Sequence, residues 1–119
     1  MIKGIGMDLI EIERIEQSLA KCDRLASRVL TRNELEIFQQ YQSDQRRAEF
    51  LAGRFSAKEA FAKATGRGIG TLSFQDIEVI SDDKGAPFIK AVGYEDDRVF
   101  VSITHSRHYA AAQVVIENK

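Results

Sequence analysis

At positions 50–66 the sequence reads FLAGRFSAKEAFAKATG, and this stretch predicts the longest element of the chain. Apolar and small residues recur along it at helical spacing, so a helix here has one side to bury. They are Leu51, Phe55, Ala57, Ala60, Ala62 and Ala64. Glycine commonly follows a helix end and aspartate commonly caps a helix start, which fits Gly66 and Asp44. We therefore expect one helix over roughly residues 44–65.

The segment upstream begins with a strand and continues into helices. Over residues 2–10 apolar side chains alternate with Gly6 and Asp8, so Asp8 faces away from the apolar side near the strand's end. From position 11 the apolar spacing becomes helical. Basic residues then recur every seven positions, and they form one stripe if the helix is continuous: Arg14, Lys21 and Arg28, with Arg24 nearby. Alternatively, Asp23 caps a second short helix.

The rest of the chain predicts a further helix and then β-structure. Thr31 and Glu34 match a capping box, so a helix starts there. Strands in an antiparallel meander are expected over residues 72–80, 87–92, 99–104 and 109–116. Gly85 suits a left-handed turn between the first two, and Pro87 lacks a backbone N–H and so marks an edge strand. The fold class is α+β, with an N-terminal strand and helices packed on an antiparallel sheet.

The composition predicts one globular domain spanning residues 1–119. Apolar runs are far shorter than the ~20 residues of a membrane span, and we expect no signal peptide and no membrane partner. A single cysteine, Cys22, excludes an internal disulfide and favours a reducing, cytoplasmic location. One cysteine and two histidines cannot build a Cys/His zinc site, so any metal is expected to be held by carboxylates.

Charge is unevenly distributed along the chain. Residues 44–68 carry six basic and three acidic groups, whereas residues 74–98 carry seven acidic and three basic groups. Such blocks form either two solvated faces or, for the basic block, an anion site. A pI near 6.1 gives no overall basic footprint, so nucleic acid is not an expected partner.

Three stretches contain polar residues that packing alone does not explain: GIGMD at 4–8, RFSAKEAFAKATG at 54–66 and SITHS at 102–106. Each has an ordinary explanation. An acidic strand end often caps a helix, and a histidine in a polar loop is as often structural as functional. Glu59 and Lys63 form a helix-surface pair worth ~0.2–0.5 kcal/mol. Against this, cations on an otherwise apolar helix favour phosphate binding, where they act partly desolvated.

Together and in this order, the stretches resemble the holo-acyl-carrier-protein synthases of the 4′-phosphopantetheinyl transferase superfamily. GIGMDLIEIER at 4–14 resembles their opening motif, residues 54–66 resemble the central signature, and SITHS resembles the C-terminal motif. The resemblance covers the whole chain. Thr104, Leu30 and Thr65 depart from the common pattern, but none of these departures removes a charged group.

The resemblance implies an enzyme that moves 4′-phosphopantetheine from coenzyme A to a serine of apo-acyl-carrier protein, in support of fatty acid biosynthesis. The other product is adenosine 3′,5′-bisphosphate. Asp8 and Glu59 are the implied Mg²⁺ ligands, and with Lys63 they are the implied catalytic residues. Glu59 takes the serine proton directly or through a metal-bound water, and Lys63 neutralises developing charge. The implied coenzyme A contacts are Arg54, Lys58, Gly66, His105 and Ser106.

The resemblance also implies partners. Short members of the superfamily form homotrimers with active sites between subunits, the histidine motif lying across the interface from Asp8 and Glu59. The acidic carrier protein is expected to dock on the basic residues Arg14, Lys21, Arg24 and Arg28, where charge mainly speeds association. Two alternatives stay open: a broad-specificity transferase for peptidyl or polyketide carriers, and a non-catalytic anion-binding module.

Overall fold

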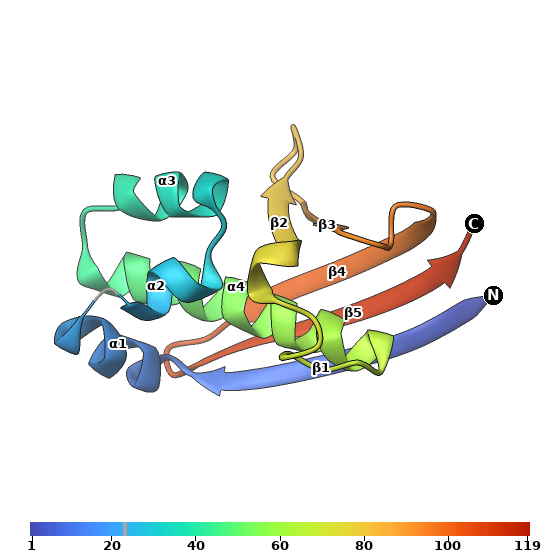
Figure 1. Cartoon of the computed structure of the whole chain (residues 1–119). Helices are drawn as coiled ribbons and strands as arrows, with labels where there is room; N and C mark the ends of the chain where they lie inside the picture. Colours follow the sequence, from blue (N-terminus) through green and yellow to red (C-terminus); the bar gives the residue numbers. More distant parts are fainter. Residues whose placement is uncertain (23) are drawn as a thin grey trace.

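The computed structural model describes residues 1–22 and 24–119, so the expectation that Asp23 caps a helix lies outside the described residues. The elements in chain order are β1 (Ile2–Glu11), α1 (Ile12–Lys21), α2 (Arg24–Val29), α3 (Arg32–Gln40), α4 (Asp44–Thr65), the 3-10 turn η1 (Phe74–Asp76), β2 (Ile77–Ser81), β3 (Pro87–Ala91), β4 (Asp97–His105) and β5 (Tyr109–Asn118). Figure 1 shows α4 crossing the sheet formed by the long strands, with α1, α2 and α3 gathered at one end.

The helices follow the sequence prediction closely, with one correction. Of the two alternatives for the basic stripe, the structure confirms a second short helix, because α1 ends at Lys21 and α2 starts separately at Arg24. The N-cap of α4 is Ser43 rather than Asp44, since the Ser43 side chain accepts a hydrogen bond from the Arg46 N–H. The end of α4 at Gly66, which has a left-handed φ of 77°, is confirmed.

The capping box predicted at the start of α3 is also confirmed. The Thr31 side chain accepts from the Glu34 N–H, and the Glu34 carboxylate accepts from the Thr31 N–H. This arrangement satisfies two of the backbone donors that a helix start leaves without partners. It also buries Glu34, which is only 1% exposed.

The strands form two separate antiparallel sheets, so the single meander predicted for the second half is wrong. The larger sheet has the order β1-β5-β4, and β2 and β3 form a hairpin of their own. The segment expected to start a strand at residue 72 instead forms η1, because Ser73 and Asp76 make a capping box there. The left-handed turn at Gly85, with a φ of 85°, is confirmed.

Two glycines of β1 let α4 lie directly on the strand. A Cβ at Gly4 would sit 2.0 Å from the Ala64 carbonyl oxygen, and one at Gly6 would sit 2.0 Å from that of Ala60. The covered face of β1 is therefore the face with the glycines and Asp8. The apolar side chains of β1 point the other way and are exposed in the single chain: Ile5, Met7 and Leu9.

Helix α4 takes part in both hydrophobic cores. Its C-terminal half packs with the inner sides of the hairpin and of β5, and its N-terminal half packs with α1, α2 and α3. Within the part of the chain that the structure describes, no helix has the length and apolar character needed to cross a membrane. The central position of α4 means that side chains on its different sides reach different parts of the fold.

Candidate active site

Asp8, Glu59 and Lys63 come together where β1 meets α4. The Lys63 ammonium donates to the Met7 carbonyl oxygen at 3.0 Å and to Asp8 Oδ1 at 3.3 Å. Glu59 lies one helical turn before Lys63 on the same side of α4. The glycines of β1 cause this approach, because they remove the side chains that would hold the strand away from the helix.

The two carboxylates of this group influence each other. Partial burial raises the pKa of Glu59, the nearby Asp8 charge raises it further, and Lys63 opposes both effects. Two carboxylates facing one opening form a hard-oxygen donor pair of the kind Mg²⁺ prefers, with room for phosphate oxygens and water as the other ligands. No group of three or more His, Cys, Asp or Glu side chains placed to hold a metal ion occurs among the described residues.

Asp8 and Glu59 line a hollow of about 430 Å³ together with Arg14 of α1, Ser18 and Leu25. Ser18 and Leu25 also line an adjacent hollow of about 530 Å³, whose other residues include Lys21, Arg24 and Arg28. The break between α1 and α2 therefore does not scatter the basic residues. All four are exposed, with Arg14 lining the opening that contains the carboxylates and the other three lining the adjacent hollow.

A second group of candidate residues lies on the other flank of α4. Arg54 and His105 line a small hollow of about 160 Å³ with Arg46 and Glu49. The Arg54 guanidinium lies 4.3 Å from the centre of the Phe50 ring, and its buried Nε has no hydrogen-bond partner among the described residues. Burial lowers the pKa of Arg54, as expected for a cation held partly out of water. An unpaired buried N–H in a cationic pocket is a natural donor for a phosphate oxygen.

His105, Ser106 and Gly66 occupy exposed chain ends and loops. His105 ends β4, and its Nε2 lies 4.0 Å from Glu49 Oε1. Ser106 starts the turn to β5, where its backbone N–H donates to the Tyr109 carbonyl oxygen at 2.8 Å. Gly66 follows the helical turn that carries Lys63. The structure thus places Gly66 near the first group and the other two residues with the second.

Within one chain, the two groups do not share a pocket. Asp8 lies on β1 and His105 on β4, and these are the two edge strands of the sheet on either side of β5. Arg54 and Glu59 are five residues apart on α4, which separates their directions by roughly 140° around the helix axis.

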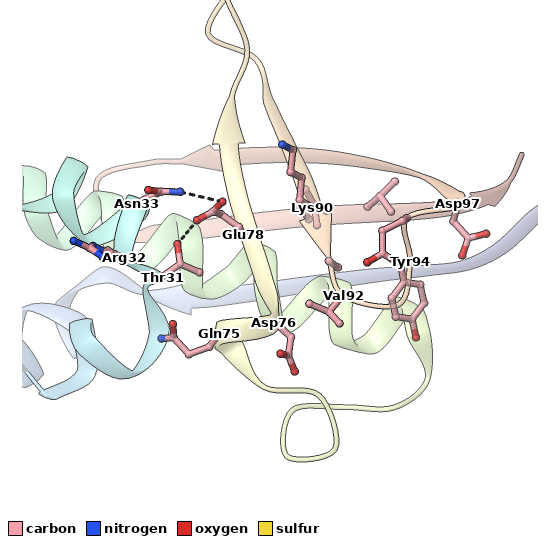
Figure 2. A pocket seen from close by; sticks show the side chains of 14 residues that line it. Thr31, Arg32, Asn33, Gln75, Asp76, Glu78, Lys90, Val92, Tyr94 and Asp97 are labelled. Carbon is pink, nitrogen blue, oxygen red and sulfur yellow. Dashed lines mark hydrogen bonds between the residues drawn. The ribbon is translucent and has the colours of Figure 1, made fainter.

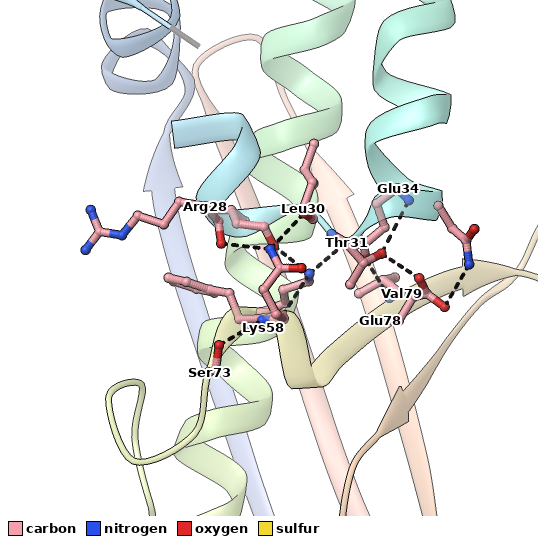
Figure 3. A network of polar contacts seen from close by, with 12 residues as sticks. Arg28, Leu30, Thr31, Glu34, Lys58, Ser73, Glu78 and Val79 are labelled. Carbon is pink, nitrogen blue, oxygen red and sulfur yellow. Dashed lines mark hydrogen bonds and ion pairs between the residues drawn. The ribbon is translucent and has the colours of Figure 1, made fainter. Parts of the chain in front are cut away.

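Lys58 does not fit the phosphate-binding role expected for it. Its side chain is fully buried, and its ammonium donates to Glu34 Oε1 at 2.6 Å, the Val29 carbonyl at 2.6 Å and the Phe74 carbonyl at 3.2 Å. Those three acceptors use all three of its N–H groups. Burial lowers its pKa, and the adjacent Glu34 charge opposes that effect. We therefore correct the sequence prediction: Lys58 is a structural lysine, as Figure 3 shows.

A hollow of about 650 Å³ elsewhere in the fold is also unsuited to a phosphate ligand. It lies between the β2–β3 hairpin and β4, and its carboxylates are Asp76, Glu78, Glu95 and Asp97. Figure 2 shows Glu78 accepting hydrogen bonds from Thr31 and Asn33 at its rim. Most of the acidic block noted in the sequence gathers around this opening, and it would repel a polyanion.

The sequence analysis counted Arg46 only as part of the basic block, and it missed Glu49 beside His105 and Gln75 at the end of α2. Glu49 and Arg46 reach the His105 pocket because Gly53, one turn beyond Glu49, allows the Ile103 side chain of β4 close to the helix. A glycine inside a long helix can mark a close approach by another element, so Gly53 was the sequence feature that pointed to this contact with β4. Nothing local marked Gln75, whose contacts lie more than forty residues away in sequence.

Comparison with known proteins agrees with this geometry. The sequence profile of the 4′-phosphopantetheinyl transferase superfamily matches residues 4–115. A holo-[acyl-carrier-protein] synthase of Bacillus pumilus is 58% identical over 98% of this chain and 97% of its own length. The synthase of Bacillus subtilis is 53% identical over 98% of this chain and 97% of its own length.

Solved structures lead to the same family. A holo-(acyl-carrier-protein) synthase from Bacillus anthracis in complex with CoA (3′,5′-ADP) superposes with a TM-score of 0.92 at 47% identity, covering 100% of this chain and 99% of its own. The Helicobacter pylori enzyme in complex with coenzyme A gives 0.82 at 32% identity, covering 95% of this chain and 99% of its own. This chain belongs to the 4′-phosphopantetheinyl transferase superfamily. The family, the fold class and the enzyme class predicted from the three motifs are confirmed.

Proposed function

We propose that this chain is a holo-acyl-carrier-protein synthase that transfers 4′-phosphopantetheine from coenzyme A to a serine hydroxyl of apo-acyl-carrier protein. The second product is adenosine 3′,5′-bisphosphate, and the holo product supports fatty acid biosynthesis in the cytoplasm. One observation carries the proposal: Asp8 and Glu59 line one opening and Lys63 binds Asp8, in a chain that matches synthases over nearly its whole length. The 119 residues act as one domain, because α4 belongs to both cores.

The chemistry follows from the positions of these three side chains. Phosphoryl transfer at a pyrophosphate depends mainly on positioning and charge stabilisation. Asp8 and Glu59 would hold Mg²⁺, which when bound supplies neutralising charge to the pyrophosphate oxygens. Glu59 accepts the proton of the attacking serine, directly or through water. Lys63 stabilises negative charge on the bridging and leaving oxygens.

The active form in this proposal is a homotrimer with sites shared between neighbours. Arg54, His105 and Ser106 of one subunit hold the nucleotide phosphates, while Asp8, Glu59, Lys63 and Gly66 come from the next. The sheet face opposite α4 supports this arrangement, because it exposes an apolar surface that includes Met7 and Phe100. A ring of identical subunits repeats one such contact and leaves no site incomplete.

The carrier protein docks beside the opening that contains the carboxylates. The basic residues around the neighbouring hollow are Lys21, Arg24 and Arg28, and Arg14 faces the carboxylate opening itself. An acidic carrier approaching this surface brings its serine to the edge of the site. These exposed charges fix orientation and speed encounter more than they add affinity.

The decisive experiment is intact-mass analysis of apo-acyl-carrier protein after incubation with the enzyme, coenzyme A and Mg²⁺. We expect a mass gain equal to one phosphopantetheine, and no gain when EDTA replaces Mg²⁺. An unmodified carrier under both conditions contradicts the proposal and favours the anion-binding module. Equal modification of peptidyl and polyketide carriers favours the broad-specificity transferase instead.

Mixing two inactive variants tests the shared site. Glu59→Ala and His105→Ala subunits, unfolded and refolded together, form mixed trimers in which some sites combine two intact halves. Random mixing makes about a quarter of the sites intact, so we expect activity to return to that level. Mixing without any recovery contradicts a site built from two subunits.

A further inference from the structure

Helix α2 is too short to hold its own position. It has six residues, and isolated helices shorter than about 12 residues are marginal in water. Nevertheless it carries Arg24 and Arg28, and its Leu25 lines both the docking hollow and the carboxylate opening. Contacts with the rest of the fold must therefore decide where its two arginines point.

The C-terminal end of α2 is held by the side chain of Gln75. Its Nε2 donates to the carbonyl oxygens of Ser27 at 3.2 Å, Arg28 at 3.2 Å and Leu30 at 2.9 Å. The last carbonyls of a helix have no partner within the helix, and the two N–H groups of this one amide are shared among two of them and the carbonyl of Leu30 just beyond α2. Figure 2 shows Gln75 extending from η1 at the edge of the acidic hollow, which it also lines.

The remaining carbonyl at this end is bound by Lys58. Its ammonium donates to the Val29 carbonyl oxygen at 2.6 Å, and a positive charge at a helix C-terminus is favourable. Lys58 precedes Glu59 directly in α4. Gln75 therefore attaches the end of α2 to η1, and Lys58 attaches it to α4, the helix that carries Glu59.

We propose that Gln75 is a positioning residue for carrier protein docking, which holds α2 so that Arg24 and Arg28 lie at a fixed place beside the carboxylate opening. The inference rests on the proposed function, since it assumes that these arginines receive the carrier. Gln75 itself touches neither substrate. It is exposed, so its removal leaves no charge buried without a partner, unlike removal of Lys58.

Gln75→Met tests this role, because methionine has the same length and lacks the donor. We expect the Michaelis constant for apo-acyl-carrier protein to rise by about three- to tenfold, as for the loss of one or two net hydrogen bonds. The constant for coenzyme A should stay within error, because the phosphate-binding residues lie on other elements. Gln40→Ala is the matched control: it removes an exposed glutamine at the end of α3 whose side chain makes no recorded hydrogen bond in the described structure, and it should change neither constant.

Backbone hydrogen exchange gives a readout that does not depend on activity. In Gln75→Met the amides of residues 24–30 should exchange faster, while those of α4 stay protected as in the wild type. Unchanged exchange in α2 together with an unchanged carrier constant overturns the inference. A rise in both Michaelis constants also overturns it, because it shows general damage instead of positioning.

The double charge reversal Arg24→Glu with Arg28→Glu tests the proposed docking surface separately from the role of Gln75. If the reversal raises the carrier constant and Gln75→Met does not, the docking surface stands and only the role of Gln75 fails. If the reversal has no effect, the docking assignment fails and the inference falls with it. If both changes act, combining Gln75→Met with the reversal should add little further effect, because the two act through the same side chains.

Discussion

Lys58 and Lys63 lie five residues apart on α4 and occupy opposite kinds of environment. Lys58 has no exposed side-chain surface and donates to three protein oxygens, whereas 56% of the Lys63 side chain is exposed beside Asp8. The sequence motif gives them similar neighbours. The rotation of the helix separates them, because five residues turn the side chain by about 140°. One lysine therefore joins elements of the fold, and the other is available to a substrate.

The largest expected effect is on stability, and it comes from replacing the buried lysine, Lys58. Lys58→Met leaves the Glu34 carboxylate buried without its cation, and we expect the free energy of unfolding to fall by about 3–5 kcal/mol. That is a large part of the 5–15 kcal/mol typical of small domains. Urea unfolding of Lys58→Met and Lys63→Met measures the difference, with a loss below about 1 kcal/mol expected for the exposed lysine. A stable Lys58→Met that binds coenzyme A poorly would restore the phosphate-binding role.

On the side of α4 that carries Lys63, replacing Asp8 or Glu59 should have the largest effect on activity. Asp8→Ala and Glu59→Ala should each lower the turnover number by roughly a thousandfold, because each removes a proposed metal ligand and Glu59 is also the proposed base. Their unfolding free energies should change little, since neither side chain belongs to a core. Magnesium titration of each variant checks this. A wild-type rate and magnesium dependence in either variant contradicts the assignment of that residue.

Lys63→Ala should have the next largest effect on catalysis. We expect the turnover number to fall by roughly a hundredfold while the Michaelis constant for coenzyme A changes little, since the charge is needed most in the transition state. Lys90→Ala serves as the control, because it removes an exposed lysine from β3, away from both groups of site residues. If turnover is normal in Lys63→Ala, the lysine is only a surface helix partner of Glu59.

The smallest effect is expected at the docking surface. Arg24→Glu with Arg28→Glu should raise the Michaelis constant for the carrier protein by about 3- to 10-fold, because exposed charge pairs contribute little each. Added salt should mimic the change, since such charges are screened beyond a Debye length of about 8–10 Å. Measuring both substrate constants at two salt concentrations checks the selectivity. Arg14 is less suitable for this test, because it lines the carboxylate opening itself.

Local sequence patterns predicted the elements well where one segment determined the outcome. The capping box at Thr31, the end of α4 at Gly66 and the strand over residues 2–10 all depend on neighbours in the chain. The strand expected from residue 72 failed because the capping box of Ser73 and Asp76 outweighed the apolar alternation.

The same local patterns could not predict contacts between residues that are far apart in the sequence. The alternation in β1 separated Asp8 from the apolar residues, but it did not say which face α4 covers. Lys58 was predicted to bind phosphate because a sequence motif gives the residue types but not their contacts in the folded protein. Its partner Glu34 is 24 residues away, and the contacts of Gln75 span 45 to 48 residues.

The close packing of α4 on Gly4 and Gly6 has a consequence for how this protein can change over time. The distance between strand and helix is set where the main chain of one meets the main chain of the other. Main-chain atoms are the same in every residue, so substitutions in the surrounding cores can accumulate without moving Asp8 relative to Lys63. Such drift should reduce stability long before it alters the geometry of the site, whereas a single methyl group at Gly6 would displace the helix at once.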